Sequence, residues 1–403
     1  MATHAFAALV GAALLASLSM AWALGANSNS PPFAPAIGAN AISTMRAAFL
    51  VGVLATAGAV TQGGSISATV GSRLIEGATI TPLAATAGLV TAAAYMGLGV
   101  YSGYPIPAAF ATTGAMIGVG IALGGDPAWA VYRRIGAFWL AVPVVSGGIA
   151  YLTATLLRRD DVPETVGVPL LAAFVGGLLA HVRLGVVPAP PGRDQGTVAG
   201  LAARAVGGPD PLPGVDPAAV GVTLAFAAVA FVAVRRRTRR SVKGGIRSFL
   251  LVLGGVVAFS SGGTQVGLAT GPLEHLFRVR LGLPGIALLA VGGTGILAGA
   301  WMGAPRLLQA TSREYAQLGV RRSIAALVPG FVIAQAAVAL GVPVSFNNIV
   351  LSGVIGSGLA AGTAGVSRRK IATTVVFWLL TLGSSVLVGY GLYRGLSGLL
   401  GIR

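Results

Sequence analysis

The chain has no cysteine and few ionisable side chains. Its 403 residues include ten Asp and Glu and three His, and charged residues account for 9% of the total. Without cysteine, disulfide bonds, thiol catalysis and thiolate metal sites are excluded. Because a soluble domain usually carries about 25% charged residues, an ordinary soluble domain is excluded as well. We therefore expect the chain to lie mostly in lipid.

The sequence has long apolar segments instead. Hydrophobic residues make up 55% of the chain, and the mean hydropathy is +0.84. A helix that crosses a bilayer needs about 20 residues, and about twelve segments approach that length. We predict an all-α, polytopic transmembrane protein in which some helices are broken or re-entrant. The predicted spans are 4–24, 46–71, 80–101, 105–124, 135–157, 165–187, 218–234, 248–270, 285–303, 324–340, 343–365 and 371–397.

Basic residues indicate how these spans are oriented. The 27 Lys and Arg give a net charge of +17, and they lie between the apolar segments. They do not line one face, so no nucleic-acid partner is expected. The densest run, Arg235–Arg247, holds seven positive charges and is predicted to be a cytoplasmic loop. Both termini then lie outside. As an alternative role, this run would bind anionic lipid headgroups.

Two stretches of the chain are versions of one another. Gly103–Gly124 and Gly341–Gly362 coincide at seven of 22 positions, and each begins Gly-x-Pro. Phe138-Trp139-Leu140 follows the first stretch, and Phe377-Trp378-Leu379 follows the second. The repeats begin an odd number of spans apart, so the second is inverted relative to the first. Inverted repeats are typical of secondary transporters that work by alternating access around a site at the repeat interface.

This repeat divides the chain into four predicted parts. The first repeat comprises residues 1–187 and the second comprises residues 248–403. Between them lie a Pro/Gly-rich extracytoplasmic linker, 188–217, and a connecting span with the basic cytoplasmic loop, 218–247. The content of Pro, Gly and Asp in the linker predicts irregular structure.

Each repeat opens with a span that polar and flexible residues interrupt. These residues are Gly25–Pro32 in the first repeat, and Ser260–Gln265 followed by Gly271-Pro272 in the second. Irregular backbone at membrane depth persists only where it is buried in protein or lines a polar cavity. We interpret the two interruptions as parts of one site. The alternative is that they are ordinary loops at the membrane surface.

The prolines of the repeated stretch predict the start of a helix in each half. A helix N-terminus offers unpaired N–H groups and partial positive charge, which suit an anion. In the second copy, Ser345, Asn347 and Asn348 would add side-chain hydrogen bonds. In the first copy, Pro107–Phe110 would supply only backbone donors. A tight turn between packed helices is the alternative for these positions.

Several of these residues resemble the motifs of the inorganic phosphate transporter (PiT) family. Gly25-Ala26-Asn27 resembles the start of the family's GANDVANA-type motif, and Phe259–Leu273 resembles its second copy with both ends intact. Pro343-Val344-Ser345 matches the beginning of a later P-[VI]-S-T-T-H motif. The resemblance runs in the family's order from Ala23 to about Tyr393. It implies a membrane transporter of inorganic phosphate coupled to a cation.

The chain departs from this pattern at the residues that would perform the chemistry. Ser28 and Gln265 replace the two motif aspartates, which the resemblance implies would hold the coupling cation. Sodium is therefore a coupling ion that the family implies but that neutral ligands would hold only weakly. No metal ligand is assigned. The substrate-binding residues that we predict are Asn27, Ser28, Thr264, Gln265, Ser345, Asn347 and Asn348.

These replacements leave the choice of anion open. Phosphate is the first candidate because of the family. Sulfate, which is fully deprotonated and only accepts hydrogen bonds, is a close alternative, because neutral amides and helix termini would form a pocket of donors. A third alternative is a membrane scaffold or sensor that kept the fold but does not transport.

The remaining ionisable residues give little indication of other chemistry. Glu274 follows Gly271-Pro272, and we expect it to pair with Arg278 or Arg280 at the membrane boundary. There is no convincing acid–base or metal constellation, so we expect neither an enzyme nor a resident cofactor. The predicted location is the plasma membrane, with the lipid bilayer as partner and a homodimer as a possible assembly.

Overall fold

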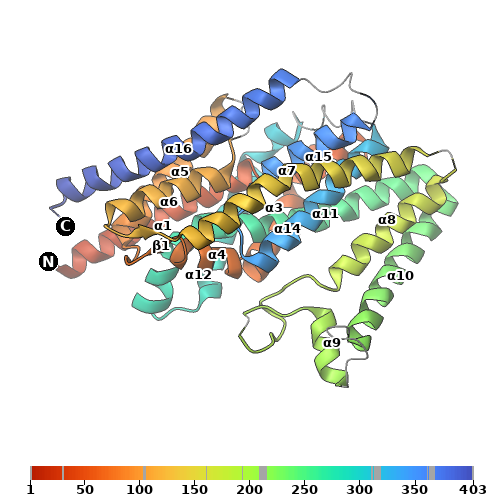
Figure 1. The fold of residues 1–403 in the computed structure, drawn as a ribbon. Coiled ribbons are helices and arrows are strands. Elements are labelled where there is room, and N and C mark those ends of the chain that lie inside the picture. The colour runs from red at the N-terminus through yellow and green to blue at the C-terminus, as the bar shows by residue number, and fades with distance from the viewer. Residues whose placement is uncertain are drawn as a thin grey trace.

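The protein is almost entirely helical, as Figure 1 shows. The computed structural model describes residues 2–29, 31–102, 106–159, 161–192, 194–207, 216–309, 312, 319–360, 362 and 368–401. Two short strands, β1 (Ile75–Glu76) and β2 (Asp126–Pro127), pair antiparallel. The helices are α1 (Ala2–Ala26), α2 (Ala34–Gly38), α3 (Thr44–Gln62), α4 (Gly64–Ser72), α5 (Pro82–Ser102), α6 (Ala108–Ala122), α7 (Trp129–Arg158), α8 (Glu164–Leu179), α9 (Val198–Val206), α10 (Pro217–Arg240), α11 (Val242–Thr270), α12 (Gly285–Met302), α14 (Val320–Leu340), α15 (Phe346–Leu359) and α16 (Arg368–Leu399). Short turns of other helix types are η1 (Pro31–Phe33), η2 (Gly271–Leu273) and η3 (Leu276–Arg280).

The number of apolar helices agrees with the prediction. Within the described residues, nine segments are long and apolar enough to cross a membrane, and α6, α8 and α15 are shorter apolar helices. The two ends of the chain lie at the same end of the bundle, and the junction of α10 and α11 lies at the opposite end (Figure 1). This arrangement agrees with the prediction that both termini lie on the side opposite the basic run.

Two expectations about connecting segments are wrong. The run Arg235–Arg247 is not a loop, because α10 continues to Arg240 and α11 begins at Val242. Ser241 stops the first helix and caps the second, since its hydroxyl accepts a hydrogen bond from the Gly244 N–H. The linker 188–217 is also less irregular than predicted. It contains α9, which Thr197 caps, while its residues 193 and 208–215 lie outside the described part.

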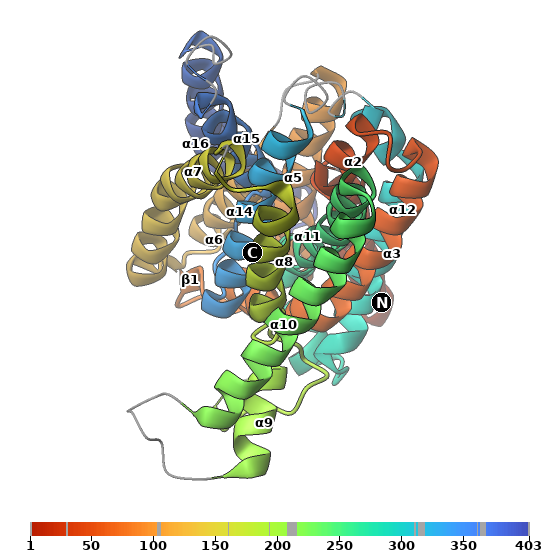
Figure 2. The same ribbon diagram turned by 90° about the vertical axis from the view of Figure 1, so that its right-hand side faces the viewer.

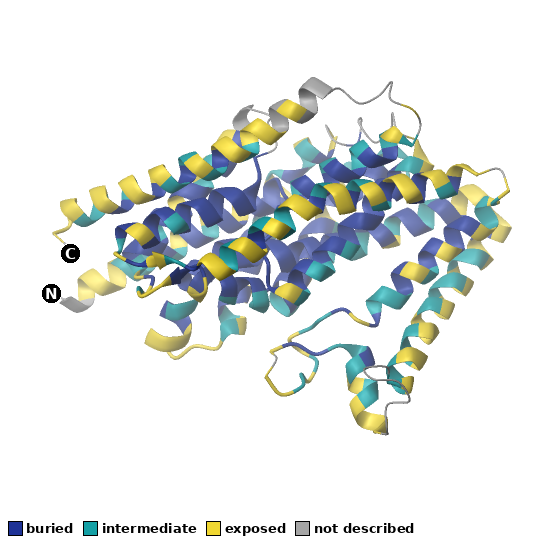
Figure 3. Cartoon of the chain, in the orientation of Figure 1, coloured by how far each residue is buried: buried dark blue, intermediate teal, exposed yellow. Residues whose placement is uncertain are grey.

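The helices differ in how deeply they lie in the bundle. α8 packs against α10, and together with α9 they form an arm beside the bundle that Figure 2 shows from the side. Figure 3 shows that the central helices, α11 among them, are mostly buried, whereas α10 and α16 are exposed along much of their length. Apolar side chains cover these exposed surfaces, as expected where helices face lipid.

The expected interruption of α11 at Ser260–Gln265 is also wrong, since the helix is continuous from Val242 to Thr270. The hydroxyl groups in this segment find acceptors within the helix. Ser260, Ser261 and Thr264 donate to the carbonyl oxygens of Val256, Ala258 and Ser261. The backbone therefore has no need to leave the helix to satisfy them. The break comes later, where Gly271-Pro272 forms η2, as the second part of that prediction states.

The interruption in the first half falls where it was expected. α1 ends at Ala26, Asn27–Asn29 form a turn, and Pro31–Phe33 form η1 before α2 begins. Proline cannot donate a backbone hydrogen bond and ends the helix here. All of these segments are buried, so the irregular backbone lies inside the protein.

Glycines at matching places in the two halves bring pairs of helices into close contact. α1 packs against α12, and α3 packs against α11. A Cβ atom at Gly25 in α1 would overlap the carbonyl oxygen of Ile296. A Cβ at Gly262, which takes the equivalent place in α11, would overlap the carbonyl oxygen of Ala55. Helices in a membrane associate closely where small residues let the backbones approach.

The partner helices contribute the reciprocal contacts. A Cβ at Gly58 in α3 would overlap the carbonyl oxygen of Phe259, and a Cβ at Gly299 in α12 would overlap that of Trp22. The later helices show the same relation, because α6 packs against α16 as α15 packs against α7. Each helix pair between the halves therefore has a counterpart in which the roles of the two halves are exchanged. This is the packing expected of two related repeats, whose boundaries stay a prediction.

Replacing Gly58 by alanine should lower stability. The new methyl group has no room beside the Phe259 carbonyl, and overpacking of this kind typically costs about 1–3 kcal/mol. The matched control is Gly97→Ala in α5, where nothing lies within 4 Å of the added Cβ and the change should stabilise slightly. Thermal unfolding of both variants in detergent measures the difference. Equal melting temperatures would contradict the close helix contact.

Candidate substrate site

Gly341 explains why the repeated stretch contains Gly-x-Pro. It lies at the end of α14 with φ +61°, a left-handed conformation that glycine adopts without strain. Its N–H donates to Val338 and that of Val342 donates to Ala337, which closes the end of the helix. The chain then runs extended until α15 starts. The equivalent Gly103 and Pro105 of the first copy lie outside the described residues.

The start of α15 lies well inside the membrane-spanning bundle. The indole N–H of Trp139 in α7 donates to the carbonyl oxygen of Pro343 at 2.8 Å. Trp139 is about 15 Å along the axis of α7 from its first residue, Trp129, in a helix about 45 Å long. The unpaired N–H groups at the start of α15 therefore lie beside the middle part of α7, away from both of its ends. This is where helix-terminal charge acts most strongly on an anion.

The start of α6 lies close to the same place. The ring of Phe110 is 3.9 Å from that of Trp139 and 6.2 Å from that of Trp378, measured between centroids. The two tryptophans are the equivalent residues of the repeated Phe-Trp-Leu motif. Pro107 precedes α6, and Ala108 and the next residue are buried without any polar side chain. Residues 107–110 of this copy therefore offer only backbone donors.

Hydrogen bonds join the motifs of the two halves around α15. Gln265 donates from Nε2 to the carbonyl oxygen of Val344 at 3.0 Å. Asn347 donates from Nδ2 to Oδ1 of Asn27 at 3.5 Å. Residues more than 300 positions apart therefore meet at the N-terminus of this helix. The structure thus brings Asn27, Gln265 and Asn347 together around α15.

Buried polar atoms without hydrogen-bond partners occur in the motif residues next to these contacts. Within the described part of the chain, such an atom occurs in most of the predicted site residues. Natural proteins leave very few buried polar groups unpaired, so these atoms call for partners such as water, an ion or a bound substrate. At the two motifs these atoms are Ser28 Oγ, both amide atoms of Asn29, Gln265 Oε1, Ser345 Oγ and Asn348 Oδ1.

Thr264 behaves differently from the other predicted residues. Its side chain is fully buried, and its hydroxyl donates to the carbonyl oxygen of Ser261 one turn earlier in α11. The hydroxyl proton is thus already used within the helix. Thr264 would offer a ligand only its oxygen, as an acceptor.

Three further residues that the sequence analysis did not select also have buried, unpaired polar atoms. Asn29 follows Ser28 directly, and its amide is completely buried with neither end paired. Thr112 and Thr113 of α6 are buried, and neither hydroxyl has a partner in the described structure. Helical threonines usually donate to the preceding turn. Two adjacent threonines inside an apolar segment, just after Pro107–Phe110, are the sequence signal by which Thr112 and Thr113 could have been selected.

A polar pocket lies beyond the end of α11. It has a volume of about 220 Å³, and its lining includes Ser67, Gln195, Glu274 and Arg278. Glu274 accepts a hydrogen bond from Arg278 at 3.3 Å, which confirms the expected local pair. Burial raises the pKa of Glu274, and the neighbouring Arg278 offsets part of that rise. This pocket therefore holds a carboxylate, unlike the cluster at α15.

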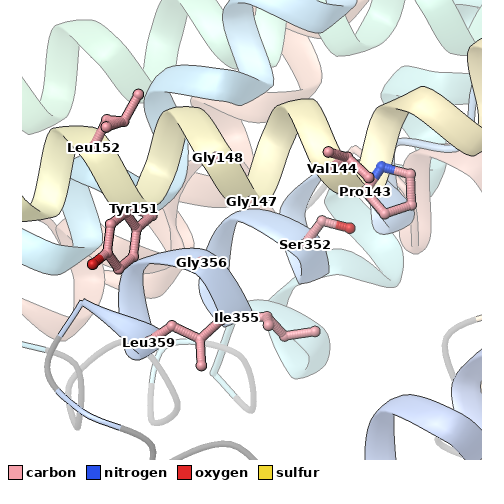
Figure 4. Close-up of a pocket in the computed structure, with 10 residues that line it drawn as sticks. All are labelled: Pro143, Val144, Gly147, Gly148, Tyr151, Leu152, Ser352, Ile355, Gly356 and Leu359. Carbon is pink, nitrogen blue, oxygen red and sulfur yellow. The ribbon is translucent and has the colours of Figure 1, made fainter.

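A larger groove on α7 and α15 is a poor place for an anion. It has a volume of about 520 Å³, and Figure 4 shows its lining of glycines and apolar side chains, with Tyr151 and Ser352. The hydroxyl of Ser352 donates to the carbonyl oxygen of Asn348 and is not free. Tyr151 is 44% exposed on the outer surface of the bundle. The composition of the groove suits an apolar occupant.

Comparison with known proteins agrees with this architecture. The chain is 23% identical to a protein of Thermococcus kodakarensis named as a phosphate permease, over 94% of this chain and 96% of that one. It is 23% identical to the chloroplastic inorganic phosphate transporter 2-1 of Arabidopsis thaliana, over 94% and 71%. A solved structure named the sodium-dependent phosphate transporter superposes with a TM-score of 0.79 at 21% identity, covering 97% of this chain and 99% of that one. This last likeness shows a shared fold.

A family model assigns the chain. The model is described as the phosphate transporter family, and it matches residues 24–389, which include both motif copies and most of both predicted repeats. Its limits nearly coincide with the range over which the motifs resemble that family. The chain belongs to the phosphate transporter family.

Proposed function

We propose that this protein is a secondary transporter that carries inorganic phosphate across a membrane. The observation that carries the proposal is the cluster of buried, unpaired polar atoms at the N-terminus of α15, between the two halves of a phosphate transporter family member. Ser28, Ser345 and the free N–H groups of α15 would donate hydrogen bonds to the oxygens of the anion. Such donors compensate the loss of water at the anion.

Alternating access is the mechanism that the packing supports. The two halves contact each other reciprocally, α1 on α12 and α3 on α11, so exchanging their roles gives a second arrangement of similar energy. The predicted site lies where the halves meet, because Asn27 belongs to the first and Asn347 to the second. A rearrangement of the halves would therefore open the site to opposite sides.

The predicted surroundings follow from the same arrangement. We place the protein in the plasma membrane, with the basic junction of α10 and α11 in the cytoplasm and both termini outside. The apolar groove on α7 and α15 then faces lipid. The homodimer considered above stays a prediction.

Sodium is the coupling ion that a solved relative's name suggests, but the residues here suit it poorly. Ser28 and Gln265 provide neutral oxygens where the family motif has aspartates. A hard cation buried among neutral ligands lacks the charge that offsets its lost hydration. We infer that sodium contributes little to transport by this chain.

Uptake into proteoliposomes tests the main proposal. The purified full chain should accumulate labelled phosphate well above protein-free liposomes, because the site offers donors at membrane depth. Labelled sulfate is measured in parallel. Absence of phosphate uptake would overturn the proposed function. Uptake of sulfate alone would then favour the sulfate alternative, and uptake of neither anion would favour the scaffold or sensor alternative.

Replacing sodium with potassium tests the coupling. Phosphate uptake by the natural chain should change by less than about twofold, because neutral ligands hold sodium weakly. The double variant Ser28→Asp/Gln265→Asp restores both carboxylates and should gain sodium dependence. The neutral control Ser28→Asn/Gln265→Asn should not. Strong sodium dependence of the natural chain would refute the inference about neutral ligands.

A further inference from the structure

We propose that Gln265 selects oxyanions that still carry a proton, so that the site admits phosphate and arsenate and rejects sulfate. This inference rests on the proposed function and names the residue that decides which tetrahedral anion is carried. It also replaces the expectation that neutral residues form a pocket of donors alone.

The orientation of the Gln265 amide is fixed by its partner. The atom 3.0 Å from the Val344 carbonyl oxygen must be the amide nitrogen, because a backbone carbonyl can only accept a hydrogen bond. The other end of the amide is therefore Oε1, an obligatory acceptor. The side chain is fully buried, and Oε1 has no partner within the described structure.

Unpaired donors lie next in the chain to Val344, the residue that holds the Gln265 amide. Ser345 follows Val344 directly, and its hydroxyl is buried and unpaired although it stands at the N-cap of α15. The first two N–H groups of α15 have no carbonyl within the helix to bind. The first bonds of the helix come from Asn348 and Ile349, whose N–H groups donate to the Ser345 carbonyl. An anion here would meet several donors and one fixed acceptor.

The fixed acceptor distinguishes anions by their protons. Inorganic phosphate and arsenate keep at least one O–H group at neutral pH, and that group would donate to Oε1. Sulfate has no proton, so one of its oxygens would face the lone pairs of Oε1, and the acceptor would stay buried and unpaired. A site with buried polar groups strongly rejects an analogue that cannot pair with them. We expect discrimination of about 10- to 100-fold on this basis.

Competition for phosphate uptake tests this selection in the natural chain. The full-length protein in proteoliposomes takes up labelled phosphate in the presence of arsenate, sulfate or monofluorophosphate. Monofluorophosphate has the shape and charge of the phosphate dianion but carries fluorine in place of the hydroxyl group. Arsenate should inhibit at concentrations close to those of unlabelled phosphate. Sulfate and monofluorophosphate should need concentrations at least about tenfold higher.

A variant then assigns the effect to the residue. Gln265→Met keeps the length of the side chain but removes both the acceptor Oε1 and the Nε2 donor to Val344. Phosphate affinity should fall, and the phosphate-to-sulfate ratio should narrow to within about threefold because the acceptor is absent. The matched control is Gln335→Met. Gln335 is another glutamine facing the bundle, but its Oε1 already accepts from Gln62 at 3.1 Å. The control should leave the ratio unchanged.

The outcomes separate this inference from the proposed function. Phosphate uptake that sulfate or monofluorophosphate inhibits as well as arsenate does would overturn the role of Gln265 and leave phosphate transport standing. An unchanged phosphate-to-sulfate ratio in Gln265→Met would also overturn the role of Gln265. It would mean that a water molecule, and not the anion, pairs with Oε1 in the natural chain. If Gln265→Met does not fold, competition by arsenate, sulfate and monofluorophosphate in the natural chain tests the proposed selectivity on its own. Failure of phosphate uptake altogether would instead reject the proposed function.

Discussion

The close approach of α1 to α12 and of α3 to α11 is the contact on which the site depends. Lipid offers helices no hydrophobic gain from pairing, so they associate through tight backbone contact at small residues. Gly25 and Gly262 make these contacts, and each lies two or three residues before a predicted site residue, Asn27 or Gln265. The glycines thereby hold both motifs at the centre of the bundle. There, the dielectric is low and hydrogen bonds to an anion are strong.

Much of the fold could be predicted because membrane helices are specified locally. A run of apolar residues must be helical in lipid, and Gly341 followed by Pro343 must end one helix and allow another. The errors arose where local sequence is ambiguous. Gly262 and Gly263 suggested a break in α11, yet glycine stays helical when a neighbouring helix packs against it, and only the tertiary structure shows that neighbour.

The candidate site was less accessible to prediction, for a different reason. The sequence showed polar residues inside apolar segments, and this signal selected Ser28, Gln265 and Ser345. It could not show which polar atoms find partners when the chain folds. Thr264 donates within its own helix, whereas Asn29 is buried with its amide unpaired. That distinction depends on neighbours distant in sequence, and the substrate roles of all these residues stay predictions.

The positions of two hydrogen bonds relative to the repeats indicate whether the proposed anion selectivity would persist when the conformation changes. Gln265 and Val344 both belong to the predicted second repeat, so their hydrogen bond would move with that repeat if it moved as one unit. The contact between Asn347 and Asn27 crosses from one repeat to the other, so a rearrangement of the repeats must alter it. The acceptor that we propose to discriminate phosphate from sulfate would therefore keep its orientation in both states. The contact that would change is the one between the amides of Asn27 and Asn347, so the proposed rearrangement and the proposed selectivity would depend on different residues.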